Sequence, residues 1–201
     1  MHRRAYLSAA SVLLLGGCVG DPSPAGSGGG GEGEFDLEQS PSSGQIDRTE
    51  TPRDLPDPVR DDRLRPGEGP NHDAEAIEIS VHEYVNGVRR EYDVPRFPWN
   101  EDMNESPRAH SRDMAHKGYF AKTAPNGQTF RPTGCNDWIE MLFRMHGPDA
   151  TPDAVAVAAL GAWMGSEDHK RNLVDANYLG HGIGAAVSSD GWIYLSHSLC
   201  G

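Results

Sequence analysis

A change in composition near residue 72 divides this chain into a part that can build a core and a part that cannot. From residue 19 to residue 72, glycine, proline, serine and acidic residues dominate, and large apolar side chains are sparse. Burying so little apolar surface does not offset the entropy lost when a chain is ordered. We therefore expect residues 18–72 to form a disordered tether and residues 73–201 to form the one folded domain.

The charge balance excludes one class of partner. Eighteen Lys and Arg residues stand against thirty Asp and Glu residues, which gives a net charge of -12. A phosphate backbone requires a basic face, so we expect no nucleic acid partner. Only three of the basic residues are lysines. An acidic chain that prefers arginine to lysine is typical of an extreme halophile, and an ordinary acidic protein is the alternative interpretation.

Residues 1–17 have the layout of an export signal. Arg3 and Arg4 precede a short apolar stretch at residues 9–17, which is too short to span a membrane. The arginine pair resembles the start of a twin-arginine signal, and residues 15–18 resemble a lipobox that ends at Cys18. We expect an exported protein that is anchored to the outer face of the cell membrane by a lipid on Cys18. A chance cysteine behind a plain signal peptide is the alternative.

The first half of the domain shows helical periodicity. Apolar residues recur at helical spacing over residues 77–92, so a first helix is predicted to begin near Asp73. A proline-containing loop follows at residues 94–99, and Asn100 starts a second helical region. Ser106-Pro107 suits an N-cap and a first helical residue, so this region is predicted to become a helix over residues 107–117, ended by Gly118.

The second half of the domain changes its period. A third helix is predicted from residue 136 or 137 over residues 138–145, and a fourth from Thr151. Residues 183–187 and 192–199 then alternate with period 2, and the turn between them predicts a hairpin. Helices followed by a late antiparallel hairpin indicate an α+β fold.

Three stretches of this domain resemble one known family. They are Trp99-Asn100 with residues 109–120, then residues 163–173, and finally residues 180–184 with the closing strand. Their order and spacing are similar to those of the CAP superfamily, in its prokaryotic SCP-like branch, over about residues 74–200. The resemblance implies a three-layer α-β-α sandwich with a small antiparallel sheet. It also implies a cleft with two histidines and two acidic residues, which in some members binds a divalent metal.

The cleft of this chain departs from that pattern. Lys122 replaces the usual histidine, and a protonated lysine repels a cation. Glu140 aligns with one acidic position, although a rival alignment places Cys135 there. Ser166 takes the place of the second acidic residue, and His169 is retained. These four residues (Lys122, Glu140, Ser166, His169) are the candidate cleft-binding residues, with a Lys122–Glu140 ion pair expected and at most weak binding of a divalent metal. We expect no cofactor.

No catalytic motif stands out among the remaining polar residues. His110 is predicted to be a hydrogen-bonded structural histidine on the buried face of a helix. His181 and His197 flank a strand pair, and a contact between them across it is the less favoured of two alternatives. Ser166 and His169 are three residues apart, but neither an oxyanion-hole signature nor a strained nucleophile turn accompanies them. The predicted role of Ser166 is to cap the turn that carries His169.

These observations favour a surface-anchored binding module without catalytic chemistry. Its ligand would be a lipid, a peptide or a surface polymer, in addition to the membrane that holds Cys18. A weak envelope hydrolase or a metal-assisted peptidase in the same cleft is the alternative, and a purely structural envelope protein is a third interpretation. On balance we do not expect an enzyme.

The two remaining cysteines are predicted to form a disulfide. Export places the domain outside the reducing cytoplasm, and a lipid on Cys18 leaves Cys135 and Cys200 as an even pair. Two buried free thiols are the alternative. A bridge requires Cα atoms closer than about 7 Å, which a structure tests.

Overall fold

The structure is a computed structural model that describes residues 55–61, 63–64 and 72–201. The predicted export signal, Cys18 and most of the predicted tether lie outside these residues. Within the described part, no helix is both long enough and apolar enough to cross a membrane. The elements, in chain order, are α1 (His72–Glu91), α2 (Glu101–Lys117), β1 (Trp138–His146), α3 (Pro152–Met164), α4 (Glu167–Leu173), β2 (Gly180–Val187) and β3 (Trp192–Cys200).

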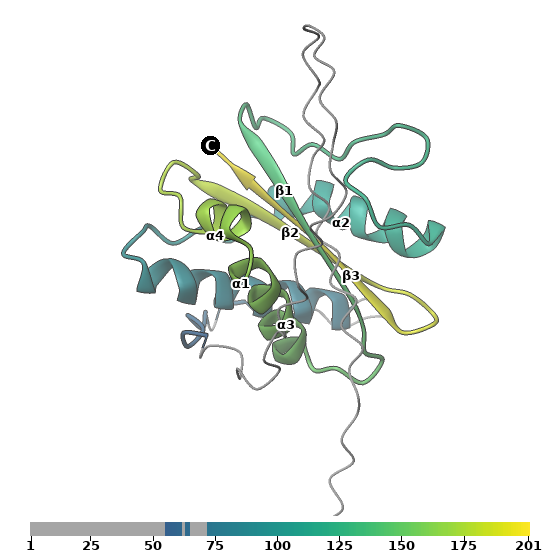
Figure 1. The fold of residues 1–201 in the computed structure, drawn as a ribbon, viewed down its shortest axis with the longest axis horizontal. Helices are drawn as coiled ribbons and strands as arrows, with labels where there is room; N and C mark the ends of the chain where they lie inside the picture. Colours follow the sequence, from purple (N-terminus) through teal and green to yellow (C-terminus); the bar gives the residue numbers. More distant parts are fainter. Residues whose placement is uncertain (1–54, 62, 65–71) are drawn as a thin grey trace, which may run out of the picture.

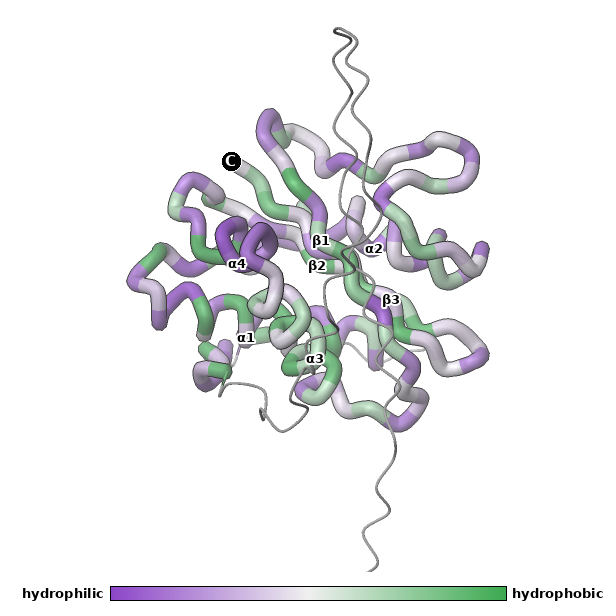
Figure 2. The backbone as a smooth tube through the Cα atoms, in the orientation of Figure 1, coloured by the Kyte–Doolittle hydropathy of each residue, from purple (hydrophilic) through white to green (hydrophobic). Residues whose placement is uncertain are grey.

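These elements form three layers (Figure 1). The middle layer is an antiparallel sheet with the order β1-β3-β2. On one face α2 packs against β2 and β3, and on the other α1 and α3 pack together over the sheet with α4 beside them. Figure 2 shows α3 as largely hydrophobic and α4 as hydrophilic. This agrees with their burial, since α3 has five buried residues and α4 only Leu173. The α+β prediction and the α-β-α sandwich are therefore confirmed.

The predicted third helix is wrong, because residues 138–146 form the strand β1. All nine of its residues pair with β3, from Trp138 opposite Cys200 to His146 opposite Trp192. Met141, Phe143 and Met145 alternate into the core. Half-buried apolar residues also lie on the opposite face, so the sequence shows no clean period of 2. An apolar run of this length does not distinguish a helix from a strand.

The second helix begins earlier than predicted. Asn100 is its N-cap and accepts hydrogen bonds from the backbone N–H groups of Asp102 and Met103, and Gly118 ends it in the left-handed conformation, as predicted. Pro107 therefore lies inside the helix, where its missing N–H leaves the Met103 carbonyl without its helical donor.

Two glycines of β2 bring this helix unusually close to the sheet. A Cβ atom at Gly182 would collide with the Met103 carbonyl, and one at Gly184 would collide with the backbone of Pro107 and Arg108. The backbone of α2 thus rests directly on β2. This contact sets the position of the α2 side chains that reach the sheet.

Part of the segment expected to be a disordered tether is packed on the domain. We call residues 55–61 the strap. Its Val59 N–H donates to the Glu83 carbonyl, and Arg60 pairs with Glu83 and Asp153 at 2.6 and 2.7 Å. Gly87 of α1 allows this approach, because a Cβ atom there would lie 2.5 Å from the Asp57 carbonyl oxygen.

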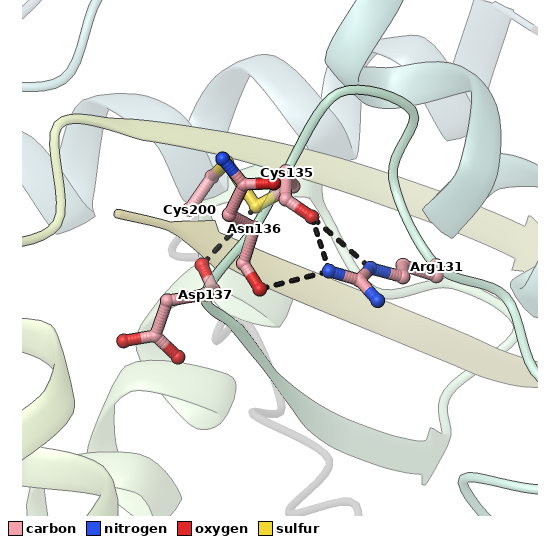
Figure 3. Close-up of a disulfide and its surroundings, with 5 residues drawn as sticks. All are labelled: Arg131, Cys135, Asn136, Asp137 and Cys200. Atoms are coloured by element: carbon pink, nitrogen blue, oxygen red, sulfur yellow. Dashed lines mark hydrogen bonds between the residues drawn. A yellow bond between two sulfur atoms is a disulfide. The ribbon is translucent and has the colours of Figure 1, made fainter.

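The predicted disulfide is confirmed. Cys135 and Cys200 are bonded, with Cα atoms 5.6 Å apart, and 65 positions separate them in the sequence (Figure 3). Arg131 holds the loop beside the bond, since its Nη2 donates to the Asn136 carbonyl at 2.8 Å and its Nε to that of Cys135 at 3.0 Å. The bridge joins the end of β3 to the residues just before β1, and so fixes the start of the β1–β3 pairing.

Candidate functional site

Glu140 lies at the centre of the candidate site, buried beneath α2. It is on the face of β1 that looks toward α2, and its Oε1 is 2.7 Å from Nδ1 of the fully buried His110. Ser196 of β3 donates to the same oxygen at 2.6 Å. Close packing of α2 on the sheet brings His110 this near to β1. The prediction that His110 is a hydrogen-bonded structural histidine is confirmed.

The partners of His110 determine where its protons lie. Its Nε2 is 3.0 Å from the carbonyl oxygen of Ala121, so Nε2 carries a hydrogen and donates it. Its Nδ1 and Glu140 then share one proton within a fully buried contact. Phe130 stacks on the imidazole, with ring centroids 4.4 Å apart and planes 10° apart. The ring cannot turn away, so the contact between His110 and Glu140 is fixed.

The backbone next to Lys122 contacts this pair, and Lys122 in turn lies near His169. His110 links Glu140 to the backbone of Ala121, the residue before Lys122. Burial lowers the pKa of His169, and the nearby charge of Lys122 lowers it further, which places these two side chains in one neighbourhood. Ser166 is at the N-cap position of α4 and makes no side-chain capping hydrogen bond. The prediction of its position was right, and the prediction of a capping bond was wrong.

Two buried polar atoms of the predicted site residues have no hydrogen-bond partner in the part of the chain that the structure describes. They are Oε2 of Glu140 and Nδ1 of His169. A buried polar atom without a partner costs about 1–3 kcal/mol. Each of these two atoms therefore lacks a hydrogen bond that a polar group of a ligand would supply.

The residues present do not fit the metal site that the family resemblance implies. Within the described ranges, no group of three or more His, Cys, Asp or Glu side chains is placed to hold a metal ion. Oε1 of Glu140 already accepts from His110 and Ser196. The ammonium of Lys122 adds positive charge where the family has a neutral ligand, and this disfavours a cation.

A second set of histidines lies between the sheet and α1. Asn86 fixes its hydrogen bonding, because the Phe97 N–H donates to its Oδ1, and its Nδ2 donates to the Phe97 carbonyl and to Nε2 of His82. Nδ1 of His82 then donates to Nε2 of His181 at 2.8 Å, and Nδ1 of His181 donates to Nε2 of His197 at 3.0 Å. We call His82, His181 and His197 the histidine chain.

Burial keeps the histidine chain neutral. It lowers the pKa of His82 to about 4 and that of His197 to about 3, and it holds the pKa of His181 well below its usual 6.5. The charge of Arg89 acts in the same direction on His181 and His197. His181 and His197 do meet, although the sequence analysis favoured the alternative in which they do not. The ring nitrogens that face a neighbouring histidine are all used in histidine–histidine hydrogen bonds. The histidine chain therefore has a structural role.

A separate groove of about 830 Å³ runs between α1, α2 and the β2–β3 hairpin. Its walls differ in charge, with acidic residues on α1 and Arg108, Arg112 and His116 on α2. None of the four predicted cleft residues lines it.

The fold and this site define a CAP-type sandwich, and the comparisons with known proteins agree. The Cysteine-rich secretory protein family, CAP, matches residues 82–198, so the chain belongs to this family. The chain is 28% identical over 122 residues to the "Uncharacterized protein YkwD" of Bacillus subtilis (strain 168). That match covers 58% of this chain and 45% of the relative, so the chain spans about half the length of that protein.

Solved structures share the fold at low sequence identity. An extracellular protein containing a SCP domain from Bacillus anthracis has a TM-score of 0.53 at 21% identity, over 67% of this chain and 44% of its own. An outer surface protein from Borrelia burgdorferi has a TM-score of 0.51 at 14% identity, over 63% and 92%. NaASP2 with Zn2+ has a TM-score of 0.50 at 14% identity, over 66% and 83%.

Proposed function

We propose that this protein is an exported, envelope-anchored CAP domain that binds a ligand and has no catalytic chemistry of its own. The state of His169 and Glu140 carries the proposal. In a hydrolytic triad, a carboxylate accepts a hydrogen bond from Nδ1 of the histidine and so orients the ring. Here Nδ1 of His169 has no hydrogen-bond partner, and Glu140 is paired with His110.

Binding is favoured by the same two residues. Oε2 of Glu140 and Nδ1 of His169 are buried and unpaired, so a ligand that hydrogen-bonds to them is stabilised. Lys122 supplies a positive charge near His169. A polar or anionic group of a lipid, a peptide or a surface polymer suits this environment.

The alternative is a weak hydrolase or metal-assisted peptidase in the same cleft. The observation that favours it is that NaASP2, which shares the fold, has been solved with Zn2+. Titration of zinc into the full chain separates the two proposals. We expect no stoichiometric binding by the wild type and at least tenfold tighter binding by Lys122→His, which restores a neutral ligand. Lys117→His, which adds a histidine on the exposed surface of α2, is the matched control and should show no gain.

Stoichiometric zinc in the wild type, with peptide hydrolysis that chelation abolishes, would establish the enzyme instead. The anchoring part of the proposal is tested separately. Mass spectrometry of membrane-extracted protein should show an N-terminus at Cys18 that carries lipid, and Cys18→Ser should be released from the membrane. A mature start at another residue contradicts the anchor.

A further inference from the structure

One face of β1 remains half-exposed next to the cleft. Side chains alternate along a strand, so Leu142, Arg144 and His146 lie on the same face as Glu140. The helix on that side, α2, packs mainly on β2 and β3. Arg144 is therefore only partly buried, and His146 is exposed. We call this surface the β1 face, and it consists of Phe120, Leu142, Arg144, His146 and Trp192.

Arg144 is held on this face by aromatic rings. The carbon at the centre of its guanidinium is 5.1 Å from the ring centroid of Phe120 and 5.1 Å from that of Trp192. Both rings are themselves half-buried. Cation–π attraction fixes the guanidinium without neutralising its charge. Its Nε is buried and has no hydrogen-bond partner.

This arrangement differs from that of three arginines which pair with carboxylates. Arg60, Arg108 and Arg171 pair with carboxylates at 2.6 to 3.0 Å. The two carboxylates that border the β1 face have other partners. Glu140 is buried with His110, and Asp190 accepts a hydrogen bond from Ser188. Among the described residues, Arg144 forms no ion pair with a carboxylate and is held on rings instead, so its charge is available to an external acid.

Another polar side chain lies beside Arg144 on the β1 face. His146 is two residues beyond Arg144 on the same strand, which separates their Cα atoms by about 6.7 Å. Its ring meets Trp192 edge-on at 5.5 Å, and its Nε2 donates to the Asp190 carbonyl at 2.9 Å, so its orientation is also fixed. A guanidinium with a second oriented polar side chain beside it suits a polymer with carboxylates and hydroxyls better than one small anion.

We propose that the β1 face binds an acidic polysaccharide, a polymer whose sugar rings carry carboxylates. The guanidinium pairs with a carboxylate through two parallel hydrogen bonds. The half-exposed rings of Phe120 and Trp192 offer apolar surface to the C–H faces of the sugars. Because the chain as a whole carries a charge of -12, an acidic polymer is repelled elsewhere and attachment is confined to this face. The inference rests on the proposed binding function and names its ligand class.

The test is titration of polygalacturonate into the full chain, with its neutral methyl ester and poly-glutamate as comparison polymers. We expect polygalacturonate to bind, the two comparison polymers to bind at least tenfold more weakly, and the affinity to fall as salt is raised. Arg144→Gln should weaken binding at least tenfold. Arg171→Gln removes the same charge from an exposed position on α4 and should change it less than twofold.

Arg144→Lys keeps the charge and loses the planar guanidinium, so it should weaken polygalacturonate binding at least threefold. This variant replaces Arg144→Gln in the test if Arg144→Gln does not fold. Absence of binding, binding unchanged by both Arg144 variants, or equal binding of poly-glutamate overturns the inference. None of these results affects the proposed binding function, which fails only if the zinc-dependent hydrolysis described above is found.

Discussion

Acid should unfold this domain through the histidine chain. A histidine whose pKa is lowered in the folded state takes up a proton when the protein unfolds below its usual pKa of 6.5. Its contribution to stability is complete above about pH 6.5 and is lost as the pH falls toward the folded pKa, which is about 4 for His82 and about 3 for His197. The window therefore lies between about pH 6.5 and pH 4.

The magnitude follows from the same values. At pH 5 the unfolded state gains about 2 kcal/mol for each histidine of the chain, or about 6 kcal/mol for all three, since one pH unit corresponds to about 1.4 kcal/mol. A domain of this kind is typically stable by about 5–15 kcal/mol, so between about two fifths and all of its stability is expected to be lost by pH 5.

Guanidinium unfolding at a series of pH values between 5 and 7.5 measures this effect. The free energy of unfolding should fall toward acid with a limiting slope of about three protons from the histidine chain, to which His169 adds because its pKa is also lowered. His82→Gln should lower that slope by about one proton whatever its own stability, and His116→Gln, on the exposed surface of α2, should leave it unchanged. A wild-type slope below one proton, or a slope unchanged in His82→Gln, would refute the reasoning.

Three further substitutions test the packing. Gly87→Ala places a Cβ atom against the Asp57 carbonyl, so it should free the strap and speed tryptic cleavage there. The control is Gly161→Ala, at an open helical position, which should add about 0.5–1 kcal/mol of stability and leave that cleavage unchanged. Gly184→Ala pushes α2 off the sheet and should cost at least about 1–3 kcal/mol in chemical denaturation. Cys200→Ser should lower the free energy of unfolding by about 2–5 kcal/mol relative to the oxidised wild type. An equal denaturation midpoint for the two proteins would show that the bridge does not stabilise the domain.

The elements that sequence analysis predicted correctly are those whose signals are local. Thr151 caps α3 by accepting from the Ala154 N–H, and the β2–β3 turn closes with the Ser188 N–H donating to the Trp192 carbonyl. Both features depend on residues within a few positions of each other. The family resemblance added the order of the layers, which no local signal contains.

The errors lie where distant segments decide the structure. β1 is a strand because β3 pairs with it, and β3 lies more than forty residues later in the chain. Pro107 is tolerated within α2 because Gly182 makes room for the Met103 carbonyl. The pairing of His110 with Glu140 was missed because it depends on β1 being a strand. Once the register of β1 is known, Glu140 lies opposite Ser198 and toward α2, and the partner becomes evident.

The strap determines how the domain responds to a pull from its N-terminal side. It runs antiparallel to α1, so that Asp57 meets Arg90, and Val59 and Asp61 meet Glu83. Tension that enters at residue 55 therefore loads the packing of Leu55 and the Asp57 contact before the Glu83 contacts. Bonds that break in turn resist less force than bonds that are sheared together. We therefore expect the strap to detach before α1 or the sheet carries the load.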